Sequence, residues 1–584
     1  MIKIVAIQDG HNASLAYMEE GEVKFAIQEE RLTRIKNTAG FPELALQELL
    51  QRHQLHIRDV DIFVFTDALN TGGWKKGQGV EYLMQKHRNL FEERKLSPVS
   101  FLRTAQKSLV GFLPSPVFGI LQERKRAEFL ERRMKPLLDL GVSRSKIKFF
   151  DHHLCHAASA AYGWGLGEKL VVITSDGAGD NLSGSVSVLE GGVLKRLALI
   201  PVEDSIARLY ALITYYLGMV PLEHEYKVMG LAPYAQDSRS ARELCAYFKK
   251  FFLLNDDGLT YHRSPGIEAT YKLGPRLTRD LKFYRFDHIA AGLQLFVEEF
   301  VTEWVHNILG TLKISNLALS GGLFMNVKLN KKIMELEGVK KLFVFPSCGD
   351  ESNVFGGLYL AYQNLTGKVP QPLRHLYLGG DFSDKEVEKS IRSYAFRNAV
   401  EWERPENVER KIAELLAGRA VVARFDGKME FGARALGNRS ILADPREWGV
   451  VKEINRMIKS RDFWMPFAPS CIELDRYVEN PKCVPAPFMI LTFDVKEGKV
   501  DKLAAALHPY DNTCRPQEVS SDSNPSYFRI ISEFERLTGE GIILNTSFNL
   551  HGHPIVYTPE DALHVFDNSG LRYLVLGPYL LKKK

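Results

Sequence analysis

Three loops of small residues, each directly following an apolar run, constrain the fold of this chain more than any other feature. The loops are Asp9-Gly10-His11-Asn12-Ala13-Ser14 after residues 4–7, Asp176-Gly177-Ala178-Gly179-Asp180 after residues 170–175, and Ser320-Gly321-Gly322 after residues 317–319. Glycine allows backbone N–H groups to approach phosphate oxygens closely, because it has no side chain. One such loop is usually a plain hairpin turn, but three of them behind buried-looking strands predict an α/β fold that binds a nucleotide.

The second and third loops supply the expected nucleotide contacts. The third loop leads toward a helix, and the free N–H groups and dipole of a helix N-terminus favour a phosphate group. The strand, turn and hairpin strand of residues 4–27 are typical of the way actin-, Hsp70- and sugar-kinase-type domains begin. The residues that we expect to contact the nucleotide are Asp176, Gly177, Gly179, Gly321, Gly322 and Asn326.

Two histidines in residues 151–157 predict a metal site. If the alanine-rich residues 157–161 continue a helix, the imidazoles of His152 and His156 point to one face and can hold one ion. A carboxylate from elsewhere in the fold, such as Asp350, would complete a set of two histidines and one carboxylate with positions left for substrate oxygens. His-x-x-x-His pairs are common by chance in a chain with 16 histidines. The glycine loops are therefore what favours a metal site over a structural pair.

The composition indicates a soluble cytoplasmic enzyme with at least two domains. A chain of 584 residues exceeds what one hydrophobic core usually supports. The net charge of +5 is small, which argues against a nucleic-acid coat and is compatible with small anionic substrates. No apolar run reaches the length of a membrane span. The six cysteines are scattered, so neither a disulfide framework nor a structural zinc site is expected.

A Pro/Gly-rich linker near residues 365–372 separates the two predicted domains, 1–366 and 373–584. The second domain begins a new α/β pattern and carries arginines set among glycines, followed by Ser and Asn donors after an apolar run at 541–544. Guanidinium groups bind phosphate or carboxylate oxygens in pairs. The expected anion-binding residues are Arg434, Arg439, Ser440, Lys459, Arg461, Arg515, Asn545, Ser547 and Asn549.

Residues 80–140 form a predicted helical insertion in the first domain. Basic residues such as Arg124, Lys125, Arg126, Arg132, Arg133 and Lys135 alternate there with acidic ones. Such mixed charge is typical of a solvated helix. The insertion would also suit the wall of an acceptor pocket or a dimer contact.

Eight strings of residues, in order along the chain, resemble the NodU/TobZ/CmcH family of O-carbamoyltransferases. They are residues 10–14, 29–36, 151–157, 225–232, 430–440, 465–469, 513–517 and 544–549. The resemblance spans nearly the whole chain. It implies a first domain similar to TsaD, with an actin/Hsp70-like (ASKHA) fold, and a second domain similar to YrdC. This sequence departs from the family pattern at Asn12, Ala433 and Asn512, where the family usually has Asp, Pro and Gly.

The resemblance implies a reaction in two steps. The YrdC-like domain would make carbamoyl-adenylate from carbamoyl phosphate and ATP, and the TsaD-like domain would transfer the carbamoyl group to a hydroxyl of a small-molecule acceptor, releasing AMP. The acceptor would be a natural product or a sugar. Carbamoyl-adenylate hydrolyses readily, so it should be made and consumed in enclosed sites.

The resemblance also implies residue roles and cofactors. His11 would deprotonate the acceptor hydroxyl, and Asp9 and Lys36 would orient His11 or stabilise the developing oxyanion. The family metal is Fe²⁺, held by His152, His156 and Asp350, and the same ligands suit Mn²⁺ or Zn²⁺. ATP would bring Mg²⁺. A homodimer is expected from the family, whereas nucleic acid and membrane partners are not.

Two other classes of function remain open. A tRNA-modifying enzyme that makes threonylcarbamoyl-adenosine uses the same two domain types, but it needs an RNA-sized basic surface. A non-catalytic nucleotide sensor on an actin-like fold would leave the Arg, Asn and Ser residues of the second domain without a purpose.

Overall fold

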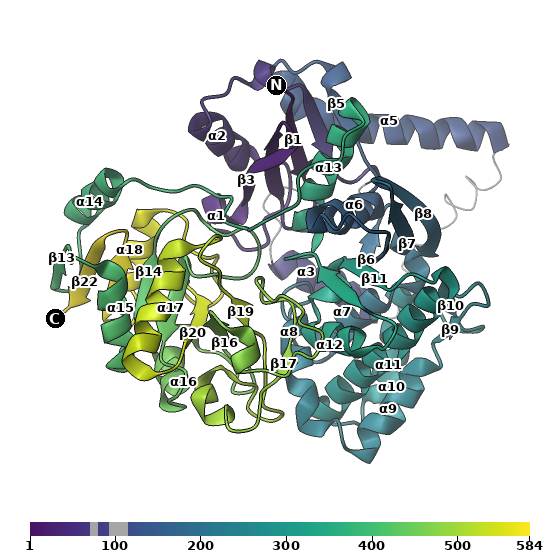
Figure 1. Ribbon diagram of the computed structural model, residues 1–584. Helices are drawn as coiled ribbons and strands as arrows, with labels where there is room; N and C mark the ends of the chain where they lie inside the picture. The colour runs from purple at the N-terminus through teal and green to yellow at the C-terminus, as the bar shows by residue number, and fades with distance from the viewer. Residues whose placement is uncertain (70–79, 93–114) are drawn as a thin grey trace.

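The first half of the chain contains two five-stranded sheets with the same strand order (Figure 1). The computed structural model describes residues 1–69, 80–92 and 115–584. The first sheet has the order β3-β2-β1-β4-β5. Its strands are β1 (Lys3–Gln8), β2 (Ser14–Glu19), β3 (Glu22–Gln28), β4 (Ile62–Phe65) and β5 (Ile147–Phe149). The strands β1 to β3 pair antiparallel, and β4 and β5 continue parallel to β1.

The second sheet repeats this arrangement. Its order, β8-β7-β6-β11-β12, again places the third, second, first, fourth and fifth strands side by side. Its strands are β6 (Leu170–Gly179), β7 (Leu182–Glu190), β8 (Val193–Pro201), β11 (Asn316–Ser320) and β12 (Lys341–Val344). The duplicated order confirms the predicted actin/Hsp70-like domain.

Two helices pack against each other between the two sheets. α6 (His152–Trp164) covers the second sheet and α13 (Asn353–Thr366) covers the first. A side chain at Gly356 would lie 1.9 Å from the carbonyl oxygen of Cys155, so glycine is required for this close approach. Because both sheets are covered, their central strands are buried on both faces and are continuously apolar. The packing fixes the start of α6 next to the loop that follows β6.

The remaining helices of this half surround the second sheet. They are α7 (Ile206–Tyr216), α8 (Glu225–Leu231), α9 (Arg239–Lys249), α10 (Gly274–Leu281), α11 (Phe286–Leu312) and α12 (Val327–Glu335), with the short strands β9 (Phe252–Leu254) and β10 (Tyr261–Arg263). The first sheet carries α1 (Glu30–Thr33) and α2 (Glu43–Arg52). The predicted loop at 176–180 is wrong in part, because β6 continues to Gly179 with an irregular pairing to β7 after Ser175. The loops after β1 and β11 and this end of β6 face the second half of the chain.

The described parts of the predicted insertion are helical, but one of its basic residues is not solvated. α3 (Val80–Phe91) and α5 (Ser115–Asp139) flank residues 93–114, and both this segment and the side chains of Arg124 and Lys125 lie outside the described part of the chain. Arg126, Arg132 and Lys135 are exposed as expected. Arg133 is 7% exposed and its guanidinium binds the carboxylate of Asp9. The α5 helix is therefore anchored to the loop after β1.

The second half of the chain forms an eight-stranded sheet of order β13-β22-β21-β14-β15-β20-β16-β19. Its strands are β13 (Val400–Glu403), β14 (Val422–Phe425), β15 (Arg439–Ala443), β16 (Ala468–Cys471), β19 (Gln517–Glu518), β20 (Ile542–Ser547), β21 (Tyr573–Leu576) and β22 (Tyr579–Lys583). β17 (Phe493–Asp494) and β18 (Thr513–Cys514) pair separately. This confirms the α/β class of the second half, while its likeness to YrdC and the division at 366 and 373 stay predictions.

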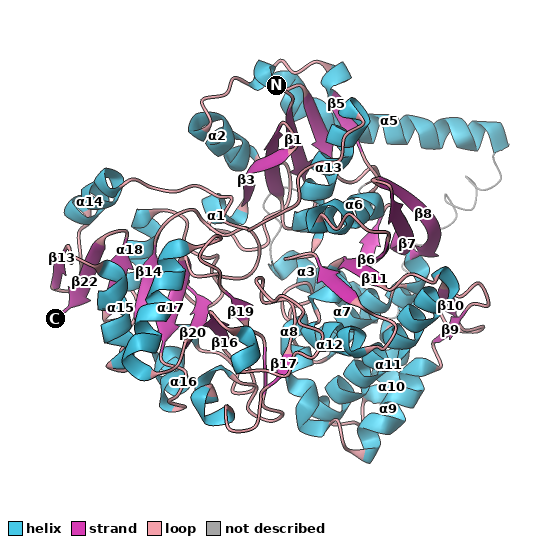
Figure 2. Ribbon diagram, in the orientation of Figure 1, coloured by secondary structure: helices cyan, strands magenta, loops and turns pink. Residues whose placement is uncertain are grey.

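Alternate residues of this sheet face two helical layers (Figure 2). Val422 and Leu442 pack with α15 (Val408–Ala417) and α17 (Pro525–Thr538), whereas Ala423 and Ile441 pack with α14 (Asp384–Ser393), α16 (Gly449–Ile454) and α18 (Pro559–Asp567). This is the period of two that a strand imposes on its side chains.

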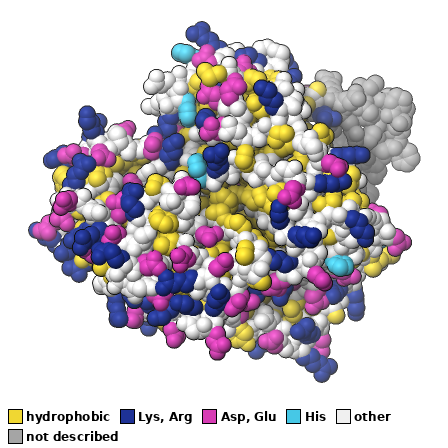
Figure 3. Space-filling model, in the orientation of Figure 1, with side chains coloured by type: hydrophobic (Ala, Val, Ile, Leu, Met, Phe, Trp, Pro, Cys, Tyr) yellow, Lys and Arg dark blue, Asp and Glu magenta, His cyan; other side chains and the backbone are white. Residues whose placement is uncertain are grey.

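The two halves share a continuous buried core. The apolar cluster around the second sheet extends to Phe431, Leu436 and residues 468–514 of the second half. Hydrogen bonds cross the junction from His508 to the carbonyl of Gly230 (2.7 Å) and from Trp464 to the carbonyl of Lys227 (3.1 Å). Figure 3 shows apolar side chains gathered at the centre of one face, where the halves meet. None of the described helices combines the length and apolarity needed to cross a membrane.

Candidate functional site

A cavity of about 930 Å³ lies at the junction of the two halves. Loops after β1 and β11 and the irregular end of β6 line one side, and loops of the eight-stranded sheet line the other. The predicted residues on its wall are His11, Lys36, Asp176, Gly177, Gly322, Asn326, Asp350, Arg434, Lys459, Arg461, Arg515, Ser547 and Asn549. One cavity therefore contains residues of all the predicted sites.

Two histidines of α6, an aspartate in the irregular end of β6 and an aspartate in the turn before α13 form a candidate metal site. The ligand atoms of His152, His156, Asp176 and Asp350 lie within 4.8 Å of one another. An oxygen of Asp350 lies 3.5 Å from Nε2 of His152 and 3.6 Å from Nε2 of His156. Asp151 caps the helix by accepting a hydrogen bond from the N–H of Leu154 (2.8 Å), which starts the helix with both imidazoles on one face. The predicted spacing argument thus holds in the structure.

The chemistry of these side chains fits a divalent cation. Nε2 of His152 and Nε2 of His156 are buried and have no hydrogen-bond partner among the described residues. Nδ1 of His152 lies 3.4 Å from Nδ2 of Asn353, and Nδ1 of His156 lies 3.2 Å from Oγ of Ser320, so both rings are held in place. Burial and the charge of His152 lower the pKa of His156 to about 3, so this imidazole is in its neutral, ligand-competent form. Burial and the charge of Asp176 raise the pKa of Asp350 to about 6. A bound cation would stabilise the ionised carboxylate.

Asp176, for which the sequence predicts a nucleotide contact, lines the cavity and belongs to the candidate metal site as well. Its carboxylate lies 3.6 Å from Nε2 of His152. Its other oxygen accepts a hydrogen bond from the N–H of Gly322 (3.0 Å) and so joins the irregular end of β6 to the segment after β11. In the sequence, the signal for this residue is a carboxylate that directly follows an apolar run.

Two of the predicted nucleotide-binding glycines do not line the cavity. A side chain at Gly179 would lie 2.1 Å from the imidazole ring of His152, so this glycine makes room for the histidine. Gly321 has φ +102° and approaches the carbonyl oxygen of Ser175, where a side chain would lie 2.3 Å away. Both glycines bring backbone segments close together, whereas Gly177 and Gly322 face the cavity.

The three residues predicted to act in transfer are placed differently. Nδ1 of His11 lies 3.3 Å from an oxygen of Asp350, on the cavity wall beside the metal site. Lys36 lines the cavity and forms an ion pair with Glu223. Asp9 does not line the cavity, since both its oxygens bind the guanidinium of Arg133 at 2.8 and 2.5 Å. His11 and Lys36 are therefore in reach of a bound substrate, and Asp9 anchors α5.

Four basic side chains of the second half form the opposite wall: Arg434, Lys459, Arg461 and Arg515. No carboxylate among the described residues lies within ion-pair distance of any of them. Burial lowers the pKa of Arg434 to about 10, and burial together with Arg434 and Arg461 lowers the pKa of Arg515. Burial, Arg461 and Lys36 lower the pKa of Lys459. Lys459 is buried, and the three arginines are partly buried on the cavity wall. Cations without counter-charges in such a wall favour an anion, so we call these four residues the cationic wall.

Hydrogen bonds fix two members of the cationic wall. Nζ of Lys459 donates to Oδ1 of Asn549 (2.7 Å) and Oγ of Ser547 (3.1 Å). Nη2 of Arg461 donates to Oγ1 of Thr546 (3.0 Å), and its guanidinium lies over the ring of Phe467. Both cations are thus held in place by residues at the end of β20.

Three of the predicted anion-binding residues lie outside the cavity. Arg439 is buried, lies 3.7 Å above the ring of Phe425 and donates to the carbonyls of Asp426 (2.9 Å) and Gly427 (3.1 Å). Oγ of Ser440 accepts a hydrogen bond from the N–H of Gly437 (3.0 Å). Nδ2 of Asn545 donates to the carbonyl of Ala435 (3.2 Å). These three residues hold the segment 430–440 in place. Arg434 of this segment lines the cavity, whereas Arg439 and Ser440 are buried in the core.

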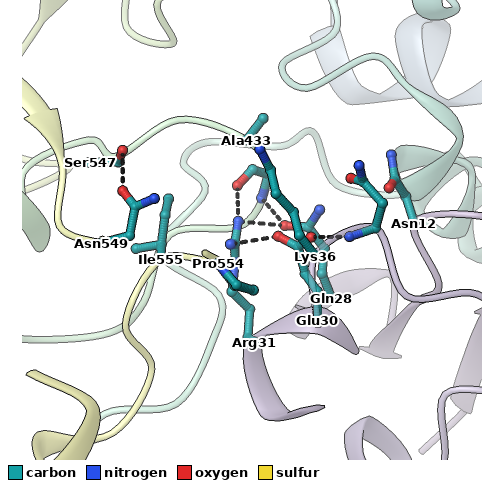
Figure 4. Close-up of polar contacts among 12 residues, drawn as sticks. Asn12, Gln28, Glu30, Arg31, Lys36, Ala433, Ser547, Asn549, Pro554 and Ile555 are labelled. Carbon is teal, nitrogen blue, oxygen red and sulfur yellow. Dashed lines mark hydrogen bonds and ion pairs between the residues drawn. The ribbon is translucent and has the colours of Figure 1, made fainter. Parts of the chain in front are cut away.

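A network at the junction holds this loop against the first half (Figure 4). Nη2 of Arg31, at α1, donates to the carbonyl of Gly432 (2.6 Å) and to Oε1 of Gln28 (3.0 Å). The N–H of Gly432 donates to the same Gln28 oxygen (3.2 Å), and the N–H of Ala433 donates to Oγ of Ser347 (3.2 Å). Arg31 belongs to the string 29–36 that carried the family resemblance, but no role was predicted for it.

Comparisons with known sequences agree with both halves. The profile described as "Carbamoyltransferase N-terminus" matches residues 3–357, and "Carbamoyltransferase C-terminus" matches residues 413–583. Nodulation protein NolNO of Sinorhizobium fredii is 33% identical over 98% of this chain and 79% of its own length. Nodulation protein NolO of Bradyrhizobium diazoefficiens is 34% identical over 74% of this chain and 79% of its own length.

Among solved structures, two HypF proteins resemble part of the chain. HypF in its phosphate- and nucleotide-bound form covers 63% of this chain and 56% of its own, with a TM-score of 0.34 and 13% identity. T. kodakarensis HypF covers 63% of this chain and 48% of its own, with a TM-score of 0.31 and 15% identity. The fold assignment does not depend on these overlaps, because it follows from the order of the strands.

Proposed function

Because the chain belongs to the carbamoyltransferase family, we propose that it makes carbamoyl-adenylate at the cationic wall and transfers the carbamoyl group to an acceptor hydroxyl at the candidate metal site. The observation that carries the proposal is the single cavity bounded by both sites. A reactive intermediate formed at one wall reaches the other without leaving the enclosure, which limits its hydrolysis.

The first step takes place at the cationic wall. Water first cleaves carbamoyl phosphate to carbamate and phosphate. A carbamate oxygen then attacks the α-phosphorus of ATP and displaces pyrophosphate. Both substrates are anions, which Arg434, Arg461 and Arg515 neutralise through paired N–H donors. These residues also stabilise the charge that develops on the departing pyrophosphate.

The second step takes place near His11. The acceptor oxygen attacks the carbamoyl carbon, the bond from that carbon to the phosphate oxygen breaks, and AMP leaves. If Nδ1 of His11 donates to Asp350, Nε2 is the basic nitrogen that accepts the proton of the acceptor hydroxyl. Lys36, placed on the same wall, stabilises the oxyanion on the carbamoyl group.

His152, His156, Asp176 and Asp350 would hold a divalent metal ion for this step. Such an ion supplies a positive charge that stabilises a leaving phosphate. Two imidazoles and two carboxylates suit Fe²⁺, which the resemblance implies, and also Mn²⁺ or Zn²⁺. Metal analysis of the purified protein identifies the ion.

A screen of hydroxylated sugars and natural products tests the proposal. Each compound is incubated with the protein, carbamoyl phosphate, ATP and Mg²⁺, and products are read by mass spectrometry. We expect one acceptor class to gain the mass of one carbamoyl group with equimolar AMP. Release of ADP, or a requirement for bicarbonate and threonine, would contradict the proposal.

A further inference from the structure

Arg208, in the first turn of α7, faces the cavity beside the candidate metal site and has no part in the mechanism above. It lines the cavity together with Asp176 and Gly177. Ser205 caps the helix by accepting a hydrogen bond from the backbone N–H of Arg208 (3.0 Å), which fixes the backbone here. The insertion helix α3 lines the same part of the cavity with Leu83, Lys86 and Leu90.

The guanidinium of Arg208 has no counter-charge of its own. No carboxylate lies within ion-pair distance of it in the described part of the chain, and its Nε is buried without a hydrogen-bond partner. Burial lowers the pKa of Arg208, and the charges of Asp176 and Asp350 oppose that effect only in part. A metal ion bound by those two carboxylates would remove even this compensation.

A second cation lies next to Arg208. Burial and the charge of Arg208 lower the pKa of Lys86 to about 8. An anion bound beside Arg208 would compensate the guanidinium and would be attracted by Lys86 as well. Leu83 and Leu90 of the same helix are apolar members of the cavity wall.

We propose that Arg208 and Lys86 form a second anion-binding subsite, which holds a phosphate group beside the metal site. This inference rests on the proposed function. It places one anion subsite in the first half of the chain, separate from the cationic wall of the second half. The phosphate belongs either to the adenylate that delivers the carbamoyl group or to a phosphorylated acceptor.

Binding of AMP and of inorganic phosphate to the Mn²⁺-loaded protein tests the subsite by calorimetry. The Arg461→Met background weakens nucleotide binding at the cationic wall. In it, Arg208→Met is compared with Arg208→Lys, Lys86→Met and the surface control Arg239→Met, whose side chain is 93% exposed. Loss of a charge-assisted hydrogen bond to phosphate should weaken binding about tenfold or more. Arg208→Lys should lose less, and Arg239→Met nothing.

The result identifies the source of the phosphate. Weaker AMP binding in both Arg208→Met and Lys86→Met assigns the subsite to the adenylate. Unchanged AMP binding with weaker inorganic phosphate binding, at saturating AMP, assigns it to the acceptor. Unchanged affinity for both ligands overturns the inference. Failure of the proposed function is separate, because it would appear as absent pyrophosphate release in the unsubstituted protein.

Discussion

At the scale of residues, the two buried Nε2 atoms of His152 and His156 define the metal site more sharply than the distances do. A buried polar atom without a partner costs about 1–3 kcal/mol. Two of them, one helical turn apart and directed at two carboxylates, are explained by a shared ligand. The same argument applies to the cationic wall, where buried cations lack acids.

Removing one proposed metal ligand should release the ion. We expect His156→Asn and Asp176→Asn to reduce bound metal to about a tenth or less, because the first removes a ligand imidazole and the second removes a negative charge, an effect at least as large as that of outer-shell changes. Metal analysis of the purified variants is the measurement. The exposed His262→Asn serves as control. Full metal content in Asp176→Asn would remove Asp176 from the ligand set.

Glu225, on the cavity wall, should make stability depend on pH. Burial raises the pKa of Glu225 to about 7, above its unfolded value of 4.5. Its favourable contribution is therefore complete below pH 4.5 and is lost as pH rises through 7. Glu225→Gln keeps the hydrogen bond from the N–H of Leu222 (2.7 Å) and does not ionise. The Tm of this variant, relative to the unsubstituted protein, should increase between pH 5 and pH 8. A constant difference would contradict the shift.

At the scale of elements, the side chains that reach the cavity lie at or just after the ends of strands. The helix of His152 and His156 and the three apolar strands could be predicted, because spacing and hydrophobic runs are local properties. The irregular continuation of β6 to Gly179 could not, since it depends on pairing with β7. The sequence pattern did not separate Arg439 from Arg434, since the direction of side chains in the loop at 430–440 depends on hydrogen bonds to distant residues. Arg133 was missed for the same reason, because its partner Asp9 is 124 positions away.

Gly179 and Gly177, both in the irregular end of β6, should respond differently to the same substitution. A methyl group at Gly179 would lie 2.1 Å from the His152 ring, whereas one at Gly177 meets nothing within 4 Å. Gly179→Ala should cost about 1–3 kcal/mol of stability and reduce bound metal. Gly177→Ala should change neither. Equal Tm values and metal contents for the two variants would show that the loop relaxes freely.

Arg31 should control chemistry in the other half of the chain. Without the hydrogen bond from Arg31 to the carbonyl of Gly432, the loop that carries Arg434 loses one of the contacts that hold it against the first half. We expect Arg31→Met to raise the KM for carbamoyl phosphate and slow pyrophosphate release about tenfold, as loss of a buried hydrogen bond of about 1–3 kcal/mol predicts. Arg31→Lys should recover part of the rate.

Arg52→Met is the matched control for Arg31. Arg52 also crosses the junction, by donating to the carbonyl of Asp381 (2.6 Å), but that segment carries no member of the cationic wall. Pyrophosphate release by the Arg52→Met variant should stay close to that of the unsubstituted protein. Equal losses in Arg31→Met and Arg52→Met would mean that any junction contact matters, and that Arg31 has no specific role.

At the scale of the whole molecule, the arrangement of the two halves was beyond the sequence argument. Sequence patterns predicted two domains and the functional residues of each. The shared cavity could not be predicted, because it depends on how the loops of the two halves pack together. The buried core that crosses the junction holds the candidate metal site and the cationic wall on opposite sides of one enclosure. Two half-reactions in one cavity are the central claim.

Pyrophosphate release without acceptor tests this claim most directly. The unsubstituted protein, His156→Asn and Arg515→Met are each mixed with carbamoyl phosphate, ATP and Mg²⁺, and pyrophosphate is measured in the first turnover. The account predicts release by the unsubstituted protein and by His156→Asn, whose cationic wall is intact, and release at least about tenfold slower in Arg515→Met. Loss of release in His156→Asn, or normal release in Arg515→Met, would contradict the assignment of the first step to the cationic wall.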